Sequence, residues 1–304
     1  MVKIVATNSK DLTTVQRKRL TNLGEVTFFD QFTESADEYM DRVKGADIIC
    51  SGTAGLKQAY TRLEDVYVTL PFVSAAFLDF SVLKNNNVQL SNAPGVNRQA
   101  VSEWIIWMML SIARKFTDFL NSTKNYRENG NLPKLTPGLS DKKVTVLGNG
   151  NIGKTVADIV KKLGMQVTIF KRGDDLFECI KNADYVVDVL SANQTTTGLL
   201  GQDFFKEMKQ GAAFVTVTRE EIVDYDALIN NLDSEHLHFA AADCGSVLVG
   251  DTSDALYKKL KNHPRIFATP HISYGSEKSI LAGNDVMIDN VEQWIAGTPQ
   301  NLIA

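Results

Sequence analysis

The sequence has few of the residues that build disulfide scaffolds and metal sites. It contains three cysteines and four histidines among 304 residues. Cys50, Cys179 and Cys244 lie far apart without a CxxC pair, and no histidines cluster at the spacing of metal ligands. We therefore expect neither a disulfide framework nor a bound metal, and the cysteines are typical of buried thiols in a reducing compartment.

Basic charge and long apolar runs are also scarce. Lys and Arg number 32 against 36 Asp and Glu, which gives a formal net charge of -4. A chain without a basic excess lacks the electrostatic footprint that nucleic acid requires. No apolar stretch approaches the ~20 residues of a membrane span, and the apolar run at the N-terminus is too short for a signal peptide. We expect a cytoplasmic protein that binds neither nucleic acid nor membrane.

Two series of short apolar runs alternate with amphipathic stretches, the first over residues 3–92 and the second from Val144 onward. This βα alternation predicts parallel sheets, and the length suits roughly two domains. A long helix is expected between the two series, over about residues 98–126, and a loop rich in Pro and Gly follows it. A last helix after His271 closes the chain.

The stretch from Val144 to Arg172 has three glycines in GxGxxG spacing, placed between an apolar strand and a helix that leads into a second strand. In this context the glycines permit a tight turn, the approach of a pyrophosphate and close packing of helix on strand. Backbone N–H groups at the start of the helix would bind the phosphates. The predicted dinucleotide-binding residues here are Gly148, Gly150, Asn151, Ile152 and Gly153.

The end of the second strand bears on the choice of dinucleotide. An acidic residue there would accept hydrogen bonds from the ribose of NAD, whereas this sequence has Lys171 and Arg172, which suit the 2'-phosphate of NADPH. The pattern favours NADPH. NAD remains an alternative, because the two cations could be solvated strand-end residues while Asp174 or Asp175 binds the ribose.

Five segments, in this order and spacing, resemble the D-isomer-specific 2-hydroxyacid dehydrogenase family over nearly the whole chain. They are SNAPGVNRQAVSEW (91–104), VLGNGNIG (146–153), GAAFVTVTREEIVDYDAL (211–228), FAAADC (239–244) and FATPHIS (267–273).

The resemblance implies two Rossmann-like, doubly wound parallel-sheet domains. The NAD(P)-binding domain, residues 98–274, would be inserted into a flavodoxin-like substrate domain made of residues 1–97 and 275–304, with the active site in a cleft. It also implies a homodimer, in which the broad apolar face of the helix that bears Trp104 and Trp107 packs against a second subunit. A core helix within one chain is the alternative.

The reaction implied by the resemblance is the NADPH-dependent reduction of a small anionic 2-oxo acid, of the glyoxylate or hydroxypyruvate class, to a D-2-hydroxy acid. Arg219 would bind the substrate carboxylate and polarise its carbonyl, and His271 would be the general acid and base. Asp243 would receive the nicotinamide carboxamide. Without the family pattern, Arg219 and His271 would be interpreted as a surface charge and a structural histidine. The backbone donors that would complete the carboxylate site belong to Phe72, Val73 and Ser74.

One position departs from the family pattern. The family has a catalytic Glu five places after the nicotinamide Asp, hydrogen-bonded to the catalytic His, and this sequence has Leu248 there. A Leu side chain cannot accept a hydrogen bond from His271 or stabilise its charge. The departure predicts that the proton donor is scarcer at neutral pH, and therefore a feeble enzyme or one with an acid-shifted optimum.

Other carboxylates could compensate for Leu248. Glu220 and Glu221 follow Arg219 where the family usually has small residues, and Asp251 lies three places after Leu248. Either Glu could supply the missing charge, or could instead pair with Arg219 and oppose an anionic substrate. If nothing compensates, we expect the feeble or acid-shifted enzyme. The alternative function is a catalytically impaired dinucleotide-binding sensor or interaction protein on the same fold.

Overall fold

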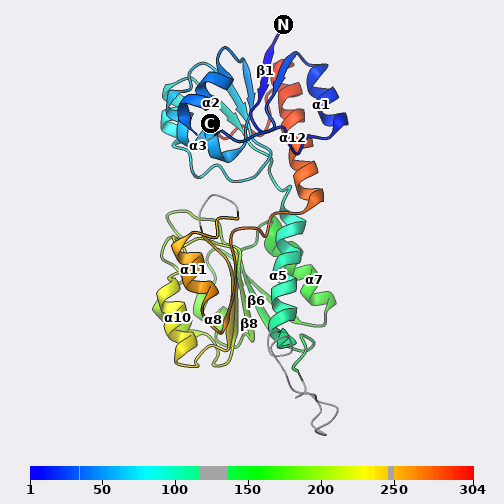
Figure 1. Ribbon diagram of the computed structural model, residues 1–304. Coiled ribbons are helices and arrows are strands. Elements are labelled where there is room, and N and C mark those ends of the chain that lie inside the picture. The colour runs from blue at the N-terminus through cyan, green and yellow to red at the C-terminus, as the bar shows by residue number, and fades with distance from the viewer. Residues whose placement is uncertain (34, 117–135, 246–249) are drawn as a thin grey trace, which may run out of the picture. The chain divides into compact units, whose positions relative to one another are not determined.

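The computed structural model describes residues 1–33, 35–116, 136–245 and 250–304. They form two compact units, the first made of residues 1–97 and 274–304 and the second of residues 98–273 (Figure 1). The second boundary precedes Tyr274, one residue earlier than the sequence suggests. Each unit contains its own parallel sheet, which confirms the expected fold class of two α/β domains.

The sheet of the first unit has the strand order β2-β1-β3-β4-β5, and every neighbouring pair is parallel. This is the order of flavodoxin-like, doubly wound sheets. The strands are β1 (Lys3–Ala6), β2 (Glu25–Phe28), β3 (Ile48–Cys50), β4 (Tyr67–Thr69) and β5 (Gln89–Ser91). The helices are α1 (Thr14–Thr21), α2 (Ala36–Val43), α3 (Thr53–Ala59), α4 (Phe80–Asn85) and α12 (Glu277–Ile295), with a 3-10 turn, η1 (Tyr60–Arg62).

Helices cover both faces of this sheet, which explains why its strands are apolar on both sides. Successive residues of a strand point to opposite faces, so Ile4 packs with Leu20 of α1 and Met287 of α12, while Val5 packs with Tyr39 of α2. Figure 1 shows α1 and α12 on one side of the sheet and α2 and α3 on the other. The C-terminal helix is therefore part of the first unit's core.

The second unit has a parallel sheet in the order β11-β10-β9-β8-β6-β7. The strands are β6 (Lys143–Leu147), β7 (Gln166–Phe170), β8 (Tyr185–Asp188), β9 (Ala213–Thr216), β10 (Phe239–Asp243) and β11 (Ile266–Thr269). The helices are α5 (Arg98–Ala113), α7 (Asn151–Lys162), α8 (Leu176–Ile180), α9 (Gln202–Glu207), α10 (Tyr225–Asp233) and α11 (Ala255–Lys261). The long helix is expected to run to about residue 126, but α5 ends at Ala113 and a turn follows in which Lys115 has φ +51. Residues 117–126 of the expected span lie outside the described residues.

Two helix layers enclose the second sheet. Helices α5 and α7 pack on each other and cover one face, and α8, α10 and α11 lie on the other (Figure 1). Three helices of this second layer begin at an aspartate whose carboxylate accepts hydrogen bonds from first-turn N–H groups, the usual device for an N-terminus. These N-caps are Asp175 for α8, Asp224 for α10 and Asp254 for α11.

The second sheet has a point where the strand order reverses. From β6 the chain continues to β7 on one side and then to β8 on the other. Helices that leave adjacent strands in opposite directions open a crevice at the carboxyl ends, and dinucleotides bind at such points in doubly wound sheets. The order of the strands therefore places a candidate site next to the glycines that follow β6.

Candidate cofactor and catalytic site

The glycine turn after β6 has the shape that a pyrophosphate requires. Gly148 has φ +119, and a Cβ on Gly153 would lie 1.9 Å from the Gly148 carbonyl oxygen, so neither position accepts a side chain without rearrangement. A Cβ on Gly150 would meet nothing within 4 Å, which leaves open space beside the backbone. Gly150 is also the N-cap of α7, and no side chain caps this helix. The first-turn N–H groups, including those of Asn151 and Ile152, are therefore suited to bind phosphate, and the residues fit a dinucleotide.

The end of β7 is followed by two exposed cations and by two aspartates whose carboxylates accept hydrogen bonds from nearby backbone N–H groups. Asp174 accepts a hydrogen bond from the Lys171 backbone N–H at 2.8 Å, and Asp175 caps α8. The side chains of Lys171 and Arg172 are exposed. Both nearby aspartates therefore form hydrogen bonds with the backbone, next to two exposed cations.

Asp243 ends β10 opposite Thr269 of β11, and its carboxylate holds the turn that bears His271. The carboxylate is 4% exposed. It accepts hydrogen bonds from the Thr269 hydroxyl, the Ile272 N–H at 2.9 Å and the Ser273 N–H at 2.8 Å. His271 has φ +52, in the left-handed region that non-glycine residues seldom adopt. Asp243 therefore braces an unusual backbone conformation at the half-buried His271.

Arg219 follows β9 at the start of a tight turn, where its carbonyl oxygen accepts hydrogen bonds from the N–H groups of Ile222 and Val223 at 3.0 and 3.2 Å. The Arg219 side chain is half-buried, while Glu220 and Glu221 are exposed. Among the described residues, neither glutamate forms a salt bridge with Arg219. Within the part of the chain described, the guanidinium is therefore not neutralised by its neighbours in sequence.

Asp188, which sequence reasoning did not single out, ends β8 and is fully buried. Its carboxylate accepts hydrogen bonds from the hydroxyls of Thr216 and Thr218 and from the Leu190 N–H. Burial raises the pKa of Asp188 to about 6, and the three hydrogen bonds oppose that rise. The sequence feature that could have pointed to Asp188 is its place as an acidic residue at the end of the apolar run YVVD.

The position of the missing carboxylate is described only in part. Leu248 lies outside the described residues. Asp251 accepts hydrogen bonds from the N–H and the hydroxyl of Ser253, and these bonds lower the pKa of its carboxyl group. Asp251 is thus engaged in its own turn.

The predicted carboxylate-binding loop Phe72–Ser74 belongs to the first unit and follows β4. The Phe72 carbonyl accepts the Ala93 N–H at 3.1 Å, and the Val73 carbonyl accepts the Asn92 side-chain amide at 2.6 Å. These bonds fix the carbonyl groups of the loop.

Strand register explains which predicted residues meet in the second unit. Leu147, Asp188 and Thr216 are paired in register across β6, β8 and β9, and Asp243 is paired with Thr269. Because the strands are parallel, the residues that follow them gather at the same edge of the sheet. The glycine turn, Arg219, Asp243 and His271 all belong to this carboxyl edge.

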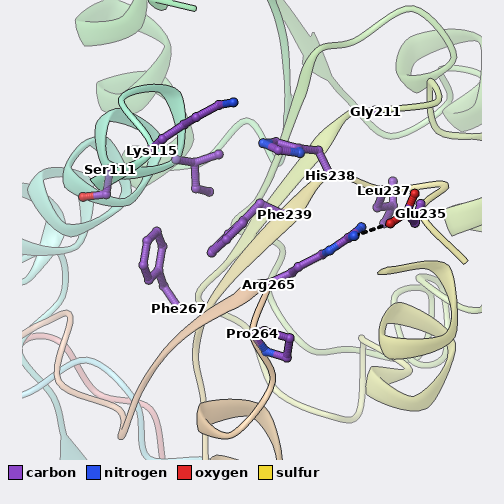
Figure 2. Close-up of a pocket in the computed structure, with 11 residues that line it drawn as sticks. Ser111, Lys115, Gly211, Glu235, Leu237, His238, Phe239, Pro264, Arg265 and Phe267 are labelled. Carbon is purple, nitrogen blue, oxygen red and sulfur yellow. Dashed lines mark hydrogen bonds and ion pairs between the residues drawn. The ribbon is translucent and has the colours of Figure 1, made fainter. Parts of the chain in front are cut away.

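A cavity of about 510 Å³ lies at the opposite, amino-terminal edge of the same sheet. Its described lining residues come from the end of α5 and from positions just before β9, β10 and β11, such as Gly211, His238 and Arg265. Figure 2 shows Arg265 paired with Glu235 there. No predicted site residue is among the described lining residues. Nor do the described residues contain a group of three or more His, Cys, Asp or Glu placed to hold a metal, or a helix able to cross a membrane.

The geometry agrees with what comparison to known proteins finds. Residues 106–273, more than half of the chain, match the model of the NAD binding domain of D-isomer specific 2-hydroxyacid dehydrogenases. A D-lactate dehydrogenase of Streptococcus pyogenes serotype M1 is 24% identical over 228 residues, which cover 68% of this chain and 69% of that protein. A glycerate dehydrogenase of Methylorubrum extorquens is 22% identical over 285 residues, covering 89% and 90%. The structure of an acyclic imino acid reductase in complex with NADPH and D-Arg is similar in fold, with a TM-score of 0.82 over 100% of both chains at 22% identity.

The raised pKa of Asp188 predicts how stability depends on pH. The folded state holds the Asp188 proton up to about pH 6, whereas the unfolded chain releases it near 3.8, so the free energy of unfolding should fall as pH rises between these values. A shift of roughly two units corresponds to about 3 kcal/mol. Urea unfolding of the wild type and Asp188→Asn from pH 4 to 7 should show the stability difference shrinking by up to about that amount. A difference that stays constant with pH would contradict the assignment.

Proposed function

The chain belongs to the D-isomer-specific 2-hydroxyacid dehydrogenase family and is an NAD(P)-dependent oxidoreductase, and we propose that it reduces a small 2-oxo acid to a D-2-hydroxy acid with NADPH. One observation carries the proposal. The glycine turn, Arg219, Asp243 and His271 follow β6, β9, β10 and β11, whose carboxyl ends share an edge of one sheet. Binding of the dinucleotide, binding of an anion and proton transfer can therefore take place beside one another.

The roles of the residues follow from their chemistry. The glycine turn would hold NADPH, which would supply the hydride for C2 of the substrate. Arg219 offers a planar fork of donors that can bind the carboxylate and polarise the carbonyl of a 2-oxo acid. His271 donates a proton to the carbonyl oxygen and accepts it in the reverse direction. Asp243 fixes the turn of His271 through the Ile272 and Ser273 N–H groups, so that the backbone next to His271 is restrained before substrate binds.

A substrate with a carbon–nitrogen double bond is a second candidate. The sequence has Leu248 at the family's Glu position, so this chain departs from the family pattern at a position linked to proton transfer. A protonated imine carries its own proton and needs less help from an acid when hydride arrives. The imino acid reductase resembles this chain in fold alone, and it indicates a substrate class to test beside the 2-oxo acids.

The catalytic assignment predicts the effect of two substitutions. Steady-state reduction of a panel of 2-oxo acids, with and without ammonium, should be measured with NADPH from pH 5 to 8. His271→Ala should lower kcat by roughly 10²–10⁴-fold, the usual contribution of a positioned acid. Arg219→Ala should lower kcat/KM by roughly 100-fold or more, because charged hydrogen bonds to the carboxylate are lost.

Matched controls come from two ion pairs at the amino-terminal edge of the same sheet. His263 is paired with Asp233, and Arg265 with Glu235, away from the carboxyl edge. Alanine at either position should change kcat/KM by less than about twofold, because neither residue belongs to the carboxyl edge where the proposed site lies. Wild-type rates no better than those of the Arg219 and His271 variants would refute the proposal, and tight NADPH binding without turnover would favour the sensor alternative.

We propose that Lys171 and Arg172 give the preference for NADPH, because Asp174 and Asp175 are engaged with the backbone. Replacing both cations by alanine should raise KM for NADPH by roughly 10–100-fold, the effect of losing one or two charge-assisted hydrogen bonds. KM for NADH should change by less than about threefold, since NADH has no 2'-phosphate. Lys181→Ala, which removes an exposed lysine paired with Glu178, is the control. Equal changes for both cofactors would argue against this assignment.

We also propose that the enzyme is a homodimer formed through α5 and the residues just after it. Trp104 is 6% exposed and packs inside the unit, whereas Trp107, Leu110 and Phe116 are 54%, 40% and 46% exposed. Trp107 and Leu110 lie one turn apart on α5, and large apolar side chains exposed side by side are typical of an interface. The face is compatible with the second subunit that the family resemblance implies.

The dimer proposal is checked by light scattering after size exclusion. The wild type should have twice the chain's 33.6 kDa, and Trp107→Glu should shift the mass toward the monomer, because a charge cannot be buried unpaired at an interface. Phe177→Glu is the control, since Phe177 is 44% exposed on α8, which lies on the other face of the sheet. A wild type of 33.6 kDa at micromolar concentration would exclude the dimer.

We place the enzyme in the cytoplasm. Cys50, Cys179 and Cys244 are all free thiols, and burial raises the pKa of Cys50 and of Cys244 to about 12. Thiols kept protonated in this way are inert structural residues, which supports a reducing compartment.

A further inference from the structure

The backbone leading to Arg219 is held by a buried hydrogen-bond network whose centre is Asp188. The hydroxyls of Thr216 and Thr218 both donate to the same carboxylate oxygen, Oδ2, the first at 2.9 Å. The other oxygen, Oδ1, accepts the Leu190 N–H at 3.1 Å. Asp188 ends β8 and Thr216 ends β9, so the network joins two neighbouring strands at the edge where the proposed site lies.

Thr218 is fixed at three points. Its hydroxyl donates to Asp188, its N–H donates to the Thr216 hydroxyl oxygen at 3.1 Å, and its carbonyl accepts the Tyr225 hydroxyl at 3.0 Å. The next residue is Arg219, whose carbonyl is held by the N–H groups of the following turn. The backbone is therefore restrained on both sides of the Arg219 side chain.

A buried carboxylate that fixes a loop lowers the stability of the fold. Asp188 is 0% exposed, and among the described residues no Lys, Arg or His forms a salt bridge with it. Burial removes an unpaired charge from water and so destabilises the fold, whereas an apolar residue of similar size would fill the same space without that loss of stability. Residues that break the rules of local stability in this way are expected where function requires a fixed geometry.

We propose that Asp188 is a positioning residue for substrate binding by Arg219. Its carboxylate acts through the Thr218 hydroxyl and holds the guanidinium where it can receive the substrate carboxylate, while Asp188 itself touches neither substrate nor cofactor. The inference rests on the proposed function of Arg219. A pre-set guanidinium binds an anion without the loss of loop entropy that an unrestrained one would incur.

Substitutions at Thr218 test the link with little change in shape. Thr218→Val removes the hydroxyl and keeps the side-chain volume, and Thr218→Ser keeps the hydroxyl. The valine variant loses the charge-assisted hydrogen bond to Asp188, and it should raise KM for the 2-oxo acid roughly tenfold, the equivalent of one such bond. It should change KM for NADPH by less than about twofold. The serine variant should restore KM to within about twofold of wild type.

Thr145→Val is the matched control. Thr145 is buried on β6 of the same sheet, and its hydroxyl donates to the Cys179 carbonyl at 2.6 Å, outside the Asp188 network. This variant should lower stability and leave KM for the 2-oxo acid within about twofold. A shift of KM in Thr145→Val as large as in Thr218→Val would show a general loss of stability and overturn the proposal.

A double-mutant cycle and amide exchange complete the test. Asp188→Asn and Thr218→Val share one hydrogen bond, so their effects on KM should be less than additive. Both should speed hydrogen exchange at the amides of Thr218, Ile222 and Val223, and Thr145→Val should not. Additive effects, unchanged exchange, or a valine variant with the KM of the serine variant would each refute the inference.

Failure of the proposed function would look different. A wild type that reduces no 2-oxo acid or imine would refute the assignment of Arg219, even where exchange shows the anchored turn. An active wild type whose KM is insensitive to Thr218→Val would refute the role of Asp188 alone.

Discussion

Parallel pairing of the strands in the second unit is the constraint on which the candidate site depends. The residues that would bind dinucleotide, bind anion and transfer protons lie more than a hundred residues apart in the chain, from Gly148 to His271. They meet because β6, β8, β9, β10 and β11 run in the same direction and are paired in register. Helices cover both faces of the sheet, so its strands are apolar, and polar chemistry can begin only where the strands end.

At that edge two aspartates are directed into the protein and brace its loops. Asp188 and Asp243 are 0% and 4% exposed, and each accepts three hydrogen bonds from the chain itself. One restrains the segment before Arg219 and the other the turn of His271, where the backbone adopts φ +52. Rigid support of this kind places functional side chains before substrate binds, which lowers the entropy that binding must offset.

Much of the fold was predictable because it depends on local periodicity. All the strands of both sheets overlap the apolar runs expected from the sequence, and the glycine turn has the geometry that its spacing predicts. The roles that the family resemblance implies for Arg219, Asp243 and His271 stay predictions. The network of Asp188 was not predictable, because its partners are 28 and 30 residues away along the chain: Thr216 ends the neighbouring strand and Thr218 follows it.

By itself, then, the sequence determined the order of the elements, the dinucleotide turn and the family, since each of these is written in spacing and residue type over short stretches. Only the tertiary structure decided which polar groups meet. It showed that Asp174 and Asp175 bind the backbone beside Lys171 and Arg172, and that Asp188 and Asp243 hold loops of other strands. The physical reason is that a hydrogen bond between strands depends on their register, and strands that are buried on both faces lack the polar and apolar alternation that would specify it.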